Sequence, residues 1–350
     1  MRLCGGVCGA LLAGAALGAA LLFAAERAAA LAADIDGARV LSACDSDGSR
    51  SPQVFPPPNT LFVSIAAYHV PAREHFLFDV LDEYMERFER WRVDVVIDTN
   101  SAEFAARVRA RYVARGGGIN ATSVRANVWS RTELRAAVQW GGSRHVAADL
   151  LLAGAHRAYA HHEAGAHAFF VYSEDDVLLT QRALELHAHS HAELWARGWT
   201  LALVRAEGDA PLLPDQPSGG GAALAALSVP SGARYVQLPS PYAALYILSA
   251  AQLARLSTTR EWRQGSDVAS FGPRERFAAG FHWTRSRDGD AFANRALTPI
   301  LANGSLDPDA FVWHLPKNYA ATPWWGAPRA DAFWAADGAD PLPIHATHIC

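Results

Sequence analysis

An apolar run that ends in three consecutive acidic residues constrains this chain more than any other feature of its sequence. Residues 168–172 (AFFVY) are rich in strand-forming side chains and lead through one serine into Glu174, Asp175 and Asp176. Apolar residues return at once, at positions 177–179. Adjacent carboxylates repel one another unless a cation or hydrogen-bond donors compensate them. The pattern predicts a buried strand with a cation site at its carboxyl end, with an acidic loop or the start of a helix as the alternative.

The segments around this run predict an α/β fold. Residues 60–67 are an apolar, strand-like run, residues 71–91 repeat apolar side chains at helical spacing, and residues 93–97 are again strand-like. This order is typical of a right-handed parallel βαβ unit, in which ligands bind beyond the carboxyl ends of the strands. The further elements that we expect are helices over 146–162, 180–197, 250–257 and 274–280 and strands over 199–204, 235–238 and 242–248.

The composition is that of a folded protein without a general affinity for polyanions. Hydrophobic residues make up 51% of the 350 positions and charged residues 19%, which is typical of a globular chain. A net charge of −4 gives no general attraction to nucleic acid or to acidic membrane surfaces. We therefore expect no nucleic-acid partner.

The N-terminal segment differs from the rest of the chain. Residues 3–25 carry no charge and are long enough to cross a bilayer as a helix. We expect residues 1–27 to be a signal anchor, with a cleaved signal peptide as the alternative, and residues 28–58 to be a stem or linker. Residues 59–350 then form one domain in the secretory lumen.

Two glycosylation triplets and two cysteines bear on that compartment. Asn120 and Asn303 each begin an acceptor triplet in a Gly-containing stretch. Cys44 and Cys350 flank the lumenal part, where they could form one disulfide or remain as two free thiols. Such triplets fit a lumenal location, and they also arise by chance.

The sequence FFVYSEDDVLL resembles the metal-binding DXD region of GT-A-fold glycosyltransferases, over a likeness that covers roughly residues 60–320. In that family a strand ends in acidic residues that hold a divalent cation, usually Mn²⁺, on the diphosphate of a nucleotide sugar. The resemblance implies Asp176 as the principal metal ligand, Glu174 as the first acidic position and Asp175 as a sugar or ribose contact. It also implies one Rossmann-like mixed sheet flanked by helices. Mg²⁺ is the alternative metal, because both ions bind carboxylates together with substrate phosphates.

Three later features fit the same family in the same order. Residues 241–246 stand where these enzymes have an acceptor-side loop, although here Ala243 and Ala244 replace the usual glycine. Glu275 resembles the base that takes the proton of the acceptor hydroxyl in inverting members, with a surface ion pair as its plain alternative. His314 resembles the histidine that completes metal coordination, and we expect it to lie beside Asp176; a buried structural histidine is the alternative.

Five further residues are candidate contacts of the nucleotide or its diphosphate. Charge builds on the leaving diphosphate during transfer, so Arg274 and Lys317 are expected to stabilise it. Arg157 lies in the expected helix before the acidic strand, and Asp98 follows the second strand, where it could approach the base or ribose or simply end a turn. Arg205, together with Glu207, follows the expected strand 199–204 and is predicted to line the cleft or to form an edge ion pair.

One group of histidines is not expected to bind metal. His187, His189 and His191 alternate along the expected helix 180–197, so they cannot share one face of it. We expect them to be solvated.

These features predict a metal-dependent glycosyltransferase of the Golgi or ER lumen, a single-pass type II membrane protein or, if residues 1–27 are cleaved, a secreted one. Its donor is a nucleotide sugar, its acceptor a hydroxyl of a glycan, lipid or protein, and its membrane contact the N-terminal helix. The alternatives are a catalytically silent lumenal protein that binds nucleotides or carbohydrates on the same fold, and a phosphoester hydrolase.

Overall fold

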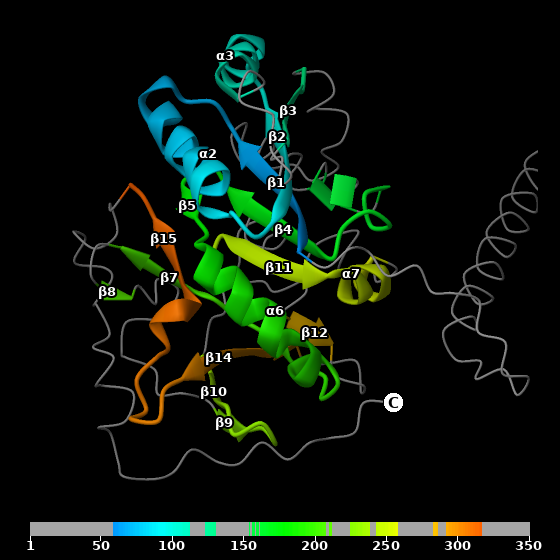
Figure 1. The fold of residues 1–350 in the computed structure, drawn as a ribbon, viewed down its shortest axis with the longest axis vertical. Coiled ribbons are helices and arrows are strands. Elements are labelled where there is room, and N and C mark those ends of the chain that lie inside the picture. The colour runs from blue at the N-terminus through cyan, green and yellow to red at the C-terminus, as the bar shows by residue number, and fades with distance from the viewer. Residues whose placement is uncertain are drawn as a thin grey trace, which may run out of the picture. The chain divides into compact units, whose positions relative to one another are not determined.

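The centre of the molecule is a five-stranded mixed sheet in the order β11-β4-β1-β2-β3. β1 (Thr60–Ala67), β2 (Arg92–Thr99), β3 (Ser123–Val128) and β4 (Phe169–Glu174) are parallel, and β11 (Leu245–Ser249) runs antiparallel to β4. Figure 1 shows β1, β4 and β11 side by side. The computed structural model describes residues 59–112, 123–130, 154, 156–157, 159–160, 162–207, 210–211, 225–238, 243–257, 283–285 and 292–316.

The strand–helix–strand opening is confirmed. η1 (Pro71–Arg73) and α2 (Glu74–Arg87) connect β1 to β2, and β1 pairs with β2 in parallel from Thr60↔Arg92 to Ala67↔Thr99. Leu77, Leu81 and Tyr84 of α2 are buried, as their helical spacing predicts. The carboxyl ends of β1, β2 and β4 therefore meet at one edge of the sheet.

The remaining helices pack against these strands. α3 (Ala102–Tyr112) lies along β2 and β3, α6 (Gln181–Trp195) contacts β11, and α7 (Ala250–Leu256) contacts β11 and β4. Thr180 caps α6 by accepting a hydrogen bond from the backbone N–H of Ala183. Ser249 and Gln252 form a capping box at the start of α7.

Smaller sheets extend the molecule beyond the single sheet that the sequence predicts. A four-stranded sheet runs in the order β5-β15-β7-β8, and Figure 1 shows β7, β8 and β15 grouped to the left of the main sheet. Its members are β5 (Val177–Leu178), β7 (Val204–Glu207), β8 (Ala210–Pro211) and β15 (Phe311–His314), the last preceded by η3 (Pro308–Ala310). A second such sheet comprises β6 (Thr200–Leu201), β14 (Ala296–Ile300), β10 (Arg234–Gln237) and β9 (Ala225–Ser228), and β12 (Trp283–Arg285) pairs with β13 (Phe292–Asn294).

The expected strand over 199–204 is wrong in its bounds. It divides into β6 and β7, which belong to different small sheets. β6 pairs with β14, whereas β7 pairs with β15, so the chain changes partners between Leu201 and Val204. An apolar run cannot reveal such a change, because every residue from Trp199 to Val204 is buried.

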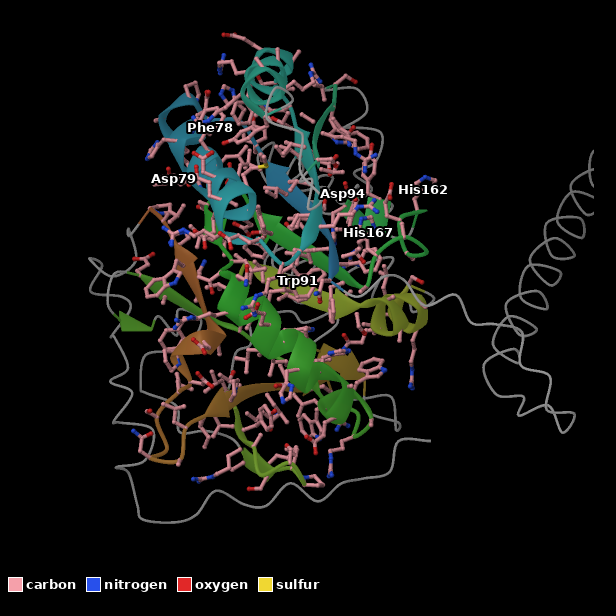
Figure 2. All side chains as sticks on the ribbon, viewed as in Figure 1. Phe78, Asp79, Trp91, Asp94, His162 and His167 are labelled. Carbon is pink, nitrogen blue, oxygen red and sulfur yellow. The ribbon has the colours of Figure 1, made fainter. Side chains whose placement is uncertain are left out.

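An ion pair between His167 and Asp94 lies at the edge of the sheet opposite the acidic turn. His167 is 1% exposed, and its Nε2 lies 2.7 Å from Oδ2 of Asp94 (Figure 2). Burial opposes ionisation of Asp94, but His167, Ser123 and Arg92 outweigh it and hold the pKa of the carboxyl well below its usual range. The pair joins β2 to the start of β4, and so it has a structural role.

Several predictions fall on residues whose structure is not described. They concern the anchor and stem (residues 1–58), both cysteines (Cys44 and Cys350), the triplet at Asn120 and the expected helix 274–280. Within the described residues, no helix combines the length and apolar character that a membrane crossing requires. Asn303 is described and exposed, as expected for an acceptor site.

Candidate metal and phosphate site

The three acidic residues form the turn between β4 and β5. The backbone N–H of Glu174 donates to the carbonyl of Ala244 (3.1 Å), and the carbonyl of Asp176 accepts from the N–H of Leu315 (2.9 Å). The turn is thus held from both sides by segments distant in sequence. The side chain of Asp176 is 4% exposed and that of Asp175 is 17% exposed. Asp176 is a buried carboxylate and not part of a solvated loop.

The residue that holds one side of this turn has an unusual backbone. Ala244 has φ = 55°, in the left-handed region that favours glycine. Ala244 is one of the two alanines that stand where the family that the sequence resembles usually has a glycine. The carbonyl of this strained residue accepts the hydrogen bond from Glu174, so the strain lies at the acidic turn.

His314 lies beside Asp176, as we expected from the sequence. Its Nε2 is 3.3 Å from Oδ2 of Asp176, and its side chain is 5% exposed. The cause is strand pairing, since β15 runs antiparallel to β5 with His314 opposite Val177. This proximity is a geometric fact, whereas metal binding by the pair stays a prediction.

A second buried carboxylate lies behind His314. Nδ1 of His314 is hydrogen-bonded to Oε1 of Glu207, whose side chain is fully buried. The parallel pairing of β7 with β15, up to Trp313↔Ala206, places Glu207 next to His314. The sequence predicted a cleft or edge position for Glu207 but not this contact, which depends on a strand pairing between distant segments.

Two arginines supply positive charge around Asp176. Nη2 of Arg73 forms an ion pair with Oδ2 of Asp176 and lies 3.6 Å from Oδ1 of Asp175. Arg205 on β7 is 5% exposed and also interacts with Asp176 electrostatically. Burial raises the pKa of Asp176, but His314, Arg73 and Arg205 outweigh it and keep this pKa below its ordinary value. Asp176 is therefore ionised at neutral pH.

The residues present fit a divalent cation that shares its coordination with a ligand. Oδ1 of Asp176 is buried and has no hydrogen-bond partner among the described residues. Its neighbours are carboxylate oxygens and an imidazole, and Glu207 orients that imidazole as carboxylates commonly orient metal-binding histidines. Within the described part of the chain, no three or more His, Cys, Asp or Glu side chains are arranged to hold a metal by themselves. Mg²⁺ and Mn²⁺ sites that are completed by substrate phosphates do not need such a group.

Arg157 lies in a buried polar cluster with Tyr246 and His156. It is 6% exposed and hydrogen-bonds with Tyr246, whose hydroxyl also lies 2.8 Å from Nε2 of His156. Burial raises the pKa of Tyr246 to about 12, and burial and the nearby Arg157 lower that of His156 well below its usual value. Tyr246 stacks on Tyr172, two positions before Glu174. Two members of the cluster, Tyr172 and Tyr246, therefore lie on the paired strands β4 and β11, and β4 leads into the acidic turn.

Asp98 is fully buried at the carboxyl end of β2. Its carboxylate accepts hydrogen bonds from Nε1 of Trp129 (3.0 Å), Nδ2 of Asn127 (3.2 Å) and Oγ of Ser64 (3.5 Å). Burial raises its pKa to about 6, against these hydrogen bonds. Here Asp98 joins β1, β2 and β3; a contact with a nucleotide stays a prediction.

Three predicted site residues lie outside the described part of the chain. They are the proposed base Glu275 and the proposed phosphate contacts Arg274 and Lys317. Their roles stay predictions.

The expectation that the histidines of α6 are solvated is wrong for His187, and His191 is half-buried. His187 is 1% exposed, and its ring stacks on that of His191 at 5.7 Å, both against Phe169. Only His189 is exposed. Residues four apart share a helix face, so His187 and His191 both contact Phe169, whereas His189 does not share that face.

Comparisons with known proteins give fold-level similarities of low score. No protein-family model matches this chain, and no curated protein matches it. A structure of S. aureus TarS 1–349 aligns with 73% of this chain at 12% identity and a TM-score of 0.38, and the alignment spans 60% of that protein. A mannosyltransferase, PcManGT from Pyrobaculum calidifontis in complex with GDP-Man and Mn²⁺, aligns with 87% of this chain and 70% of its own at 14% identity and a TM-score of 0.35.

Proposed function

We propose that this protein is a metal-dependent glycosyltransferase that moves a sugar from a nucleotide-sugar donor to a hydroxyl acceptor. The observation that carries the proposal is the buried row Asp176–His314–Glu207 at the carboxyl end of β4. Two strand pairings bring these residues together at the edge where α/β sheets bind their ligands. Core packing alone does not require two buried carboxylates around one imidazole.

The reaction makes demands that this edge can meet. A departing diphosphate gathers negative charge, which a bound Mn²⁺ or Mg²⁺ would stabilise as a Lewis acid. Asp176 and His314 would hold the ion, and Glu207 would keep the ring of His314 in the right orientation and tautomer. Glu174 and Asp175 would add a further ligand and a sugar or ribose contact. Few protein ligands suit this role, because the diphosphate supplies the rest.

The remaining roles in the proposal concern the donor and the acceptor. Arg205, 5% exposed on β7, interacts electrostatically with Asp176, which supports its proposed role as a contact of the diphosphate. Arg157, Arg274, Lys317 and Asp98 are proposed contacts of the nucleotide. Glu275 is the proposed base for the acceptor hydroxyl of a glycan, lipid or protein.

The proposal includes a location in the secretory pathway. Residues 1–27 would anchor the protein in the membrane, or be cleaved as a signal, and residues 28–58 would act as a stem. The support comes from the uncharged run at 3–25 and from the exposed triplet at Asn303. A Golgi or ER location would give the enzyme access to nucleotide sugars and Mn²⁺.

A thermal-shift screen of the full-length protein tests the function. Ligands that bind only the folded state raise the melting temperature by mass action, so one group of UDP- or GDP-sugars should stabilise the protein with Mn²⁺ but not with EDTA. The stabilising donor is then supplied with hydroxyl acceptors, and transfer is followed by mass spectrometry. Stabilisation without hydrolysis or transfer would favour a silent binding protein, and no stabilisation by any donor would contradict the proposal.

A further inference from the structure

Arg73 occupies a position that neither the sequence nor the proposed roles assigned. It ends η1, the short helix that follows the loop after β1, and its guanidinium pairs with both Asp175 and Asp176. Its side chain is 43% exposed, so solvent and solutes can reach it. Its Nε nevertheless is buried, with no hydrogen-bond partner among the described residues. Arg73 thus has one donor group on the acidic turn and another that is unused.

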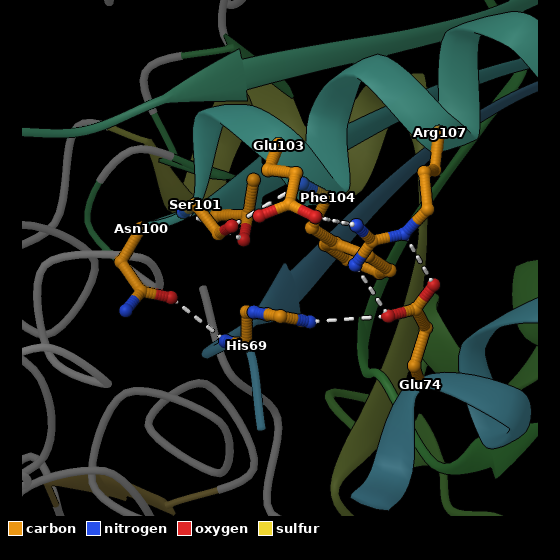
Figure 3. Close-up of polar contacts among 8 residues, drawn as sticks. His69, Glu74, Asn100, Ser101, Glu103, Phe104 and Arg107 are labelled. Carbon is orange, nitrogen blue, oxygen red and sulfur yellow. Dashed lines mark hydrogen bonds and ion pairs between the residues drawn. The ribbon is translucent and has the colours of Figure 1, made fainter. Parts of the chain in front are cut away.

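A network of polar contacts fixes the loop that carries Arg73. The N–H of His69 donates to Oδ1 of Asn100 (2.7 Å), and its ring Nε2 lies 3.2 Å from Glu74 (Figure 3). Glu74, the residue after Arg73, accepts two hydrogen bonds from Arg107 of α3 at 2.8 and 2.7 Å. The His69 ring also stacks on Phe104 at 4.6 Å. The network holds both ends of the loop, which reduces the entropic cost of placing Arg73 on the carboxylates.

The guanidinium and a metal ion compete for the charge of the same carboxylate. A cation on Oδ1 of Asp176 would sit beside the guanidinium that pairs with Oδ2, so the two positive charges repel one another. An incoming diphosphate changes this competition, because it offers the guanidinium a second anion with matching geometry. Metal and diphosphate would then each favour the binding of the other, and such coupling is reciprocal.

We propose that Arg73 is the built-in counter-ion of the cation site, pairing with Asp175 and Asp176 until metal arrives and with the donor's diphosphate afterwards. This inference rests on the proposed function. Arg73 is accordingly a positioning residue for the donor, and it couples metal binding to nucleotide binding.

The test is direct binding of Mn²⁺, without and with UDP or GDP, to wild-type protein and to Arg73→Gln. Free Mn²⁺ is followed by electron paramagnetic resonance, and nucleotide binding by calorimetry. Without nucleotide, Arg73→Gln should bind Mn²⁺ about two- to fivefold more tightly, as expected from the loss of a half-exposed competing ion pair. With Mn²⁺ present, it should bind the nucleoside diphosphate more weakly, so that the coupling between the two ligands falls.

Three control variants sharpen the result. Arg92→Gln removes the same charge beside Asp94 at the opposite edge of the sheet and should bind Mn²⁺ as the wild type does. Arg73→Lys keeps a cation and should remain close to the wild type. Glu74→Gln loosens the loop and should change Mn²⁺ affinity in the same direction as Arg73→Gln, but less. Far-ultraviolet circular dichroism confirms that each variant is folded.

The outcomes separate this inference from the proposed function. Unchanged or weaker Mn²⁺ binding by Arg73→Gln would overturn the inference even if the wild type transfers sugar. An absence of Mn²⁺ binding in both proteins would overturn it as well. Tighter Mn²⁺ binding by Arg73→Gln, with no turnover of any donor by the wild type, would support the counter-ion role and contradict the transferase.

Discussion

The imidazole of His314 lies between two buried carboxylates, and this position decides which of its nitrogens can bind a metal. Nδ1 faces Glu207 and Nε2 faces Asp176, so with the proton on Nδ1, hydrogen-bonded to Glu207, Nε2 is the nitrogen that offers its lone pair to a metal. A residue that only fills space in the core would not need this orientation. The tautomer of His314 is therefore the feature on which the cation site depends.

Replacing Glu207 should weaken metal binding without removing a ligand. In Glu207→Gln the amide can donate to Nδ1 and move the ring proton to Nε2, so we expect a loss of about 10- to 100-fold in Mn²⁺ affinity. Calorimetric titration in the presence of a nucleoside diphosphate measures it. Glu103→Gln, which removes the carboxylate of an exposed ion pair on α3, is the matched control and should have no effect. Equal affinities for wild type and Glu207→Gln would rule out the orienting role.

The backbone of Ala244 gives a prediction about stability. Ala243 and Ala244 are both buried, but only Ala244 has a positive φ. Glycine at position 244 relieves a left-handed conformation that costs about 1–2 kcal/mol, whereas glycine at 243 only removes a methyl group and adds unfolded-state entropy. Ala244→Gly should therefore be more stable than Ala243→Gly by about 1–2 kcal/mol in urea unfolding. If the two variants have the same stability, residue 244 is not strained.

At the scale of elements, Asp98 links the ends of three parallel strands and makes the sheet sensitive to pH. Its pKa is about 6 in the folded protein and near 3.8 when unfolded, so the folded state binds the proton more strongly. The contribution of Asp98 to stability is full below the unfolded value and is lost as the pH rises through about 6. The ionised carboxylate is accordingly a cost to the fold at neutral pH.

Chemical denaturation between pH 4 and pH 7 measures this contribution. The free energy of unfolding of the wild type should fall, relative to Asp98→Asn, by an amount on the order of 3 kcal/mol across this range. Both proteins contain Asp94, whose lowered pKa gives a contribution of opposite sign. That contribution therefore cancels when the two pH profiles are compared. Parallel pH profiles for the two proteins would show that Asp98 titrates normally.

Elements formed by local patterns could be predicted from the sequence, and those formed by distant pairing could not. Strand β4 and helix α2 follow from apolar periodicity, and the acidic turn follows from charge placed directly after an apolar run. The division of residues 199–207 into β6 and β7 depends on which partner strand lies beside each half. The burial of His187 likewise depends on Phe169, which packs against it from another element.

The candidate site shows the same division at the scale of the whole molecule. Asp176 and His314 could be named from the sequence because a family resemblance placed them in order. Arg73 and the role of Glu207 could not, because each contacts the site only after β1, β7 and β15 have taken their places. Contacts of this kind are set by strand register, which single-sequence patterns do not encode.

Location is also a property of the whole molecule, and Asn303 provides a test of it. The residue is exposed in a turn in which its Oδ1 accepts hydrogen bonds from the N–H and hydroxyl of Ser305. If the chain enters the secretory lumen, Asn303 should carry a glycan, and Asn303→Gln should lose about 2–3 kDa, roughly one N-linked glycan, on a denaturing gel. Treatment with an endoglycosidase should remove the difference. Full-length protein without any glycan, expressed in animal cells, would contradict the lumenal location.

The central claim is that Asp176 holds a cation on the diphosphate of a nucleotide sugar. Release of nucleoside diphosphate from the donor found by the thermal-shift screen, followed with Mn²⁺ and with EDTA, tests it most directly. Asp176→Asn should lose activity by about 100-fold or more while keeping its fold, as loss of a group that acts on transition-state charge does. Asp79→Asn, an exposed change on α2, should retain full activity. Wild-type activity in EDTA, or undiminished activity of Asp176→Asn, would contradict the account.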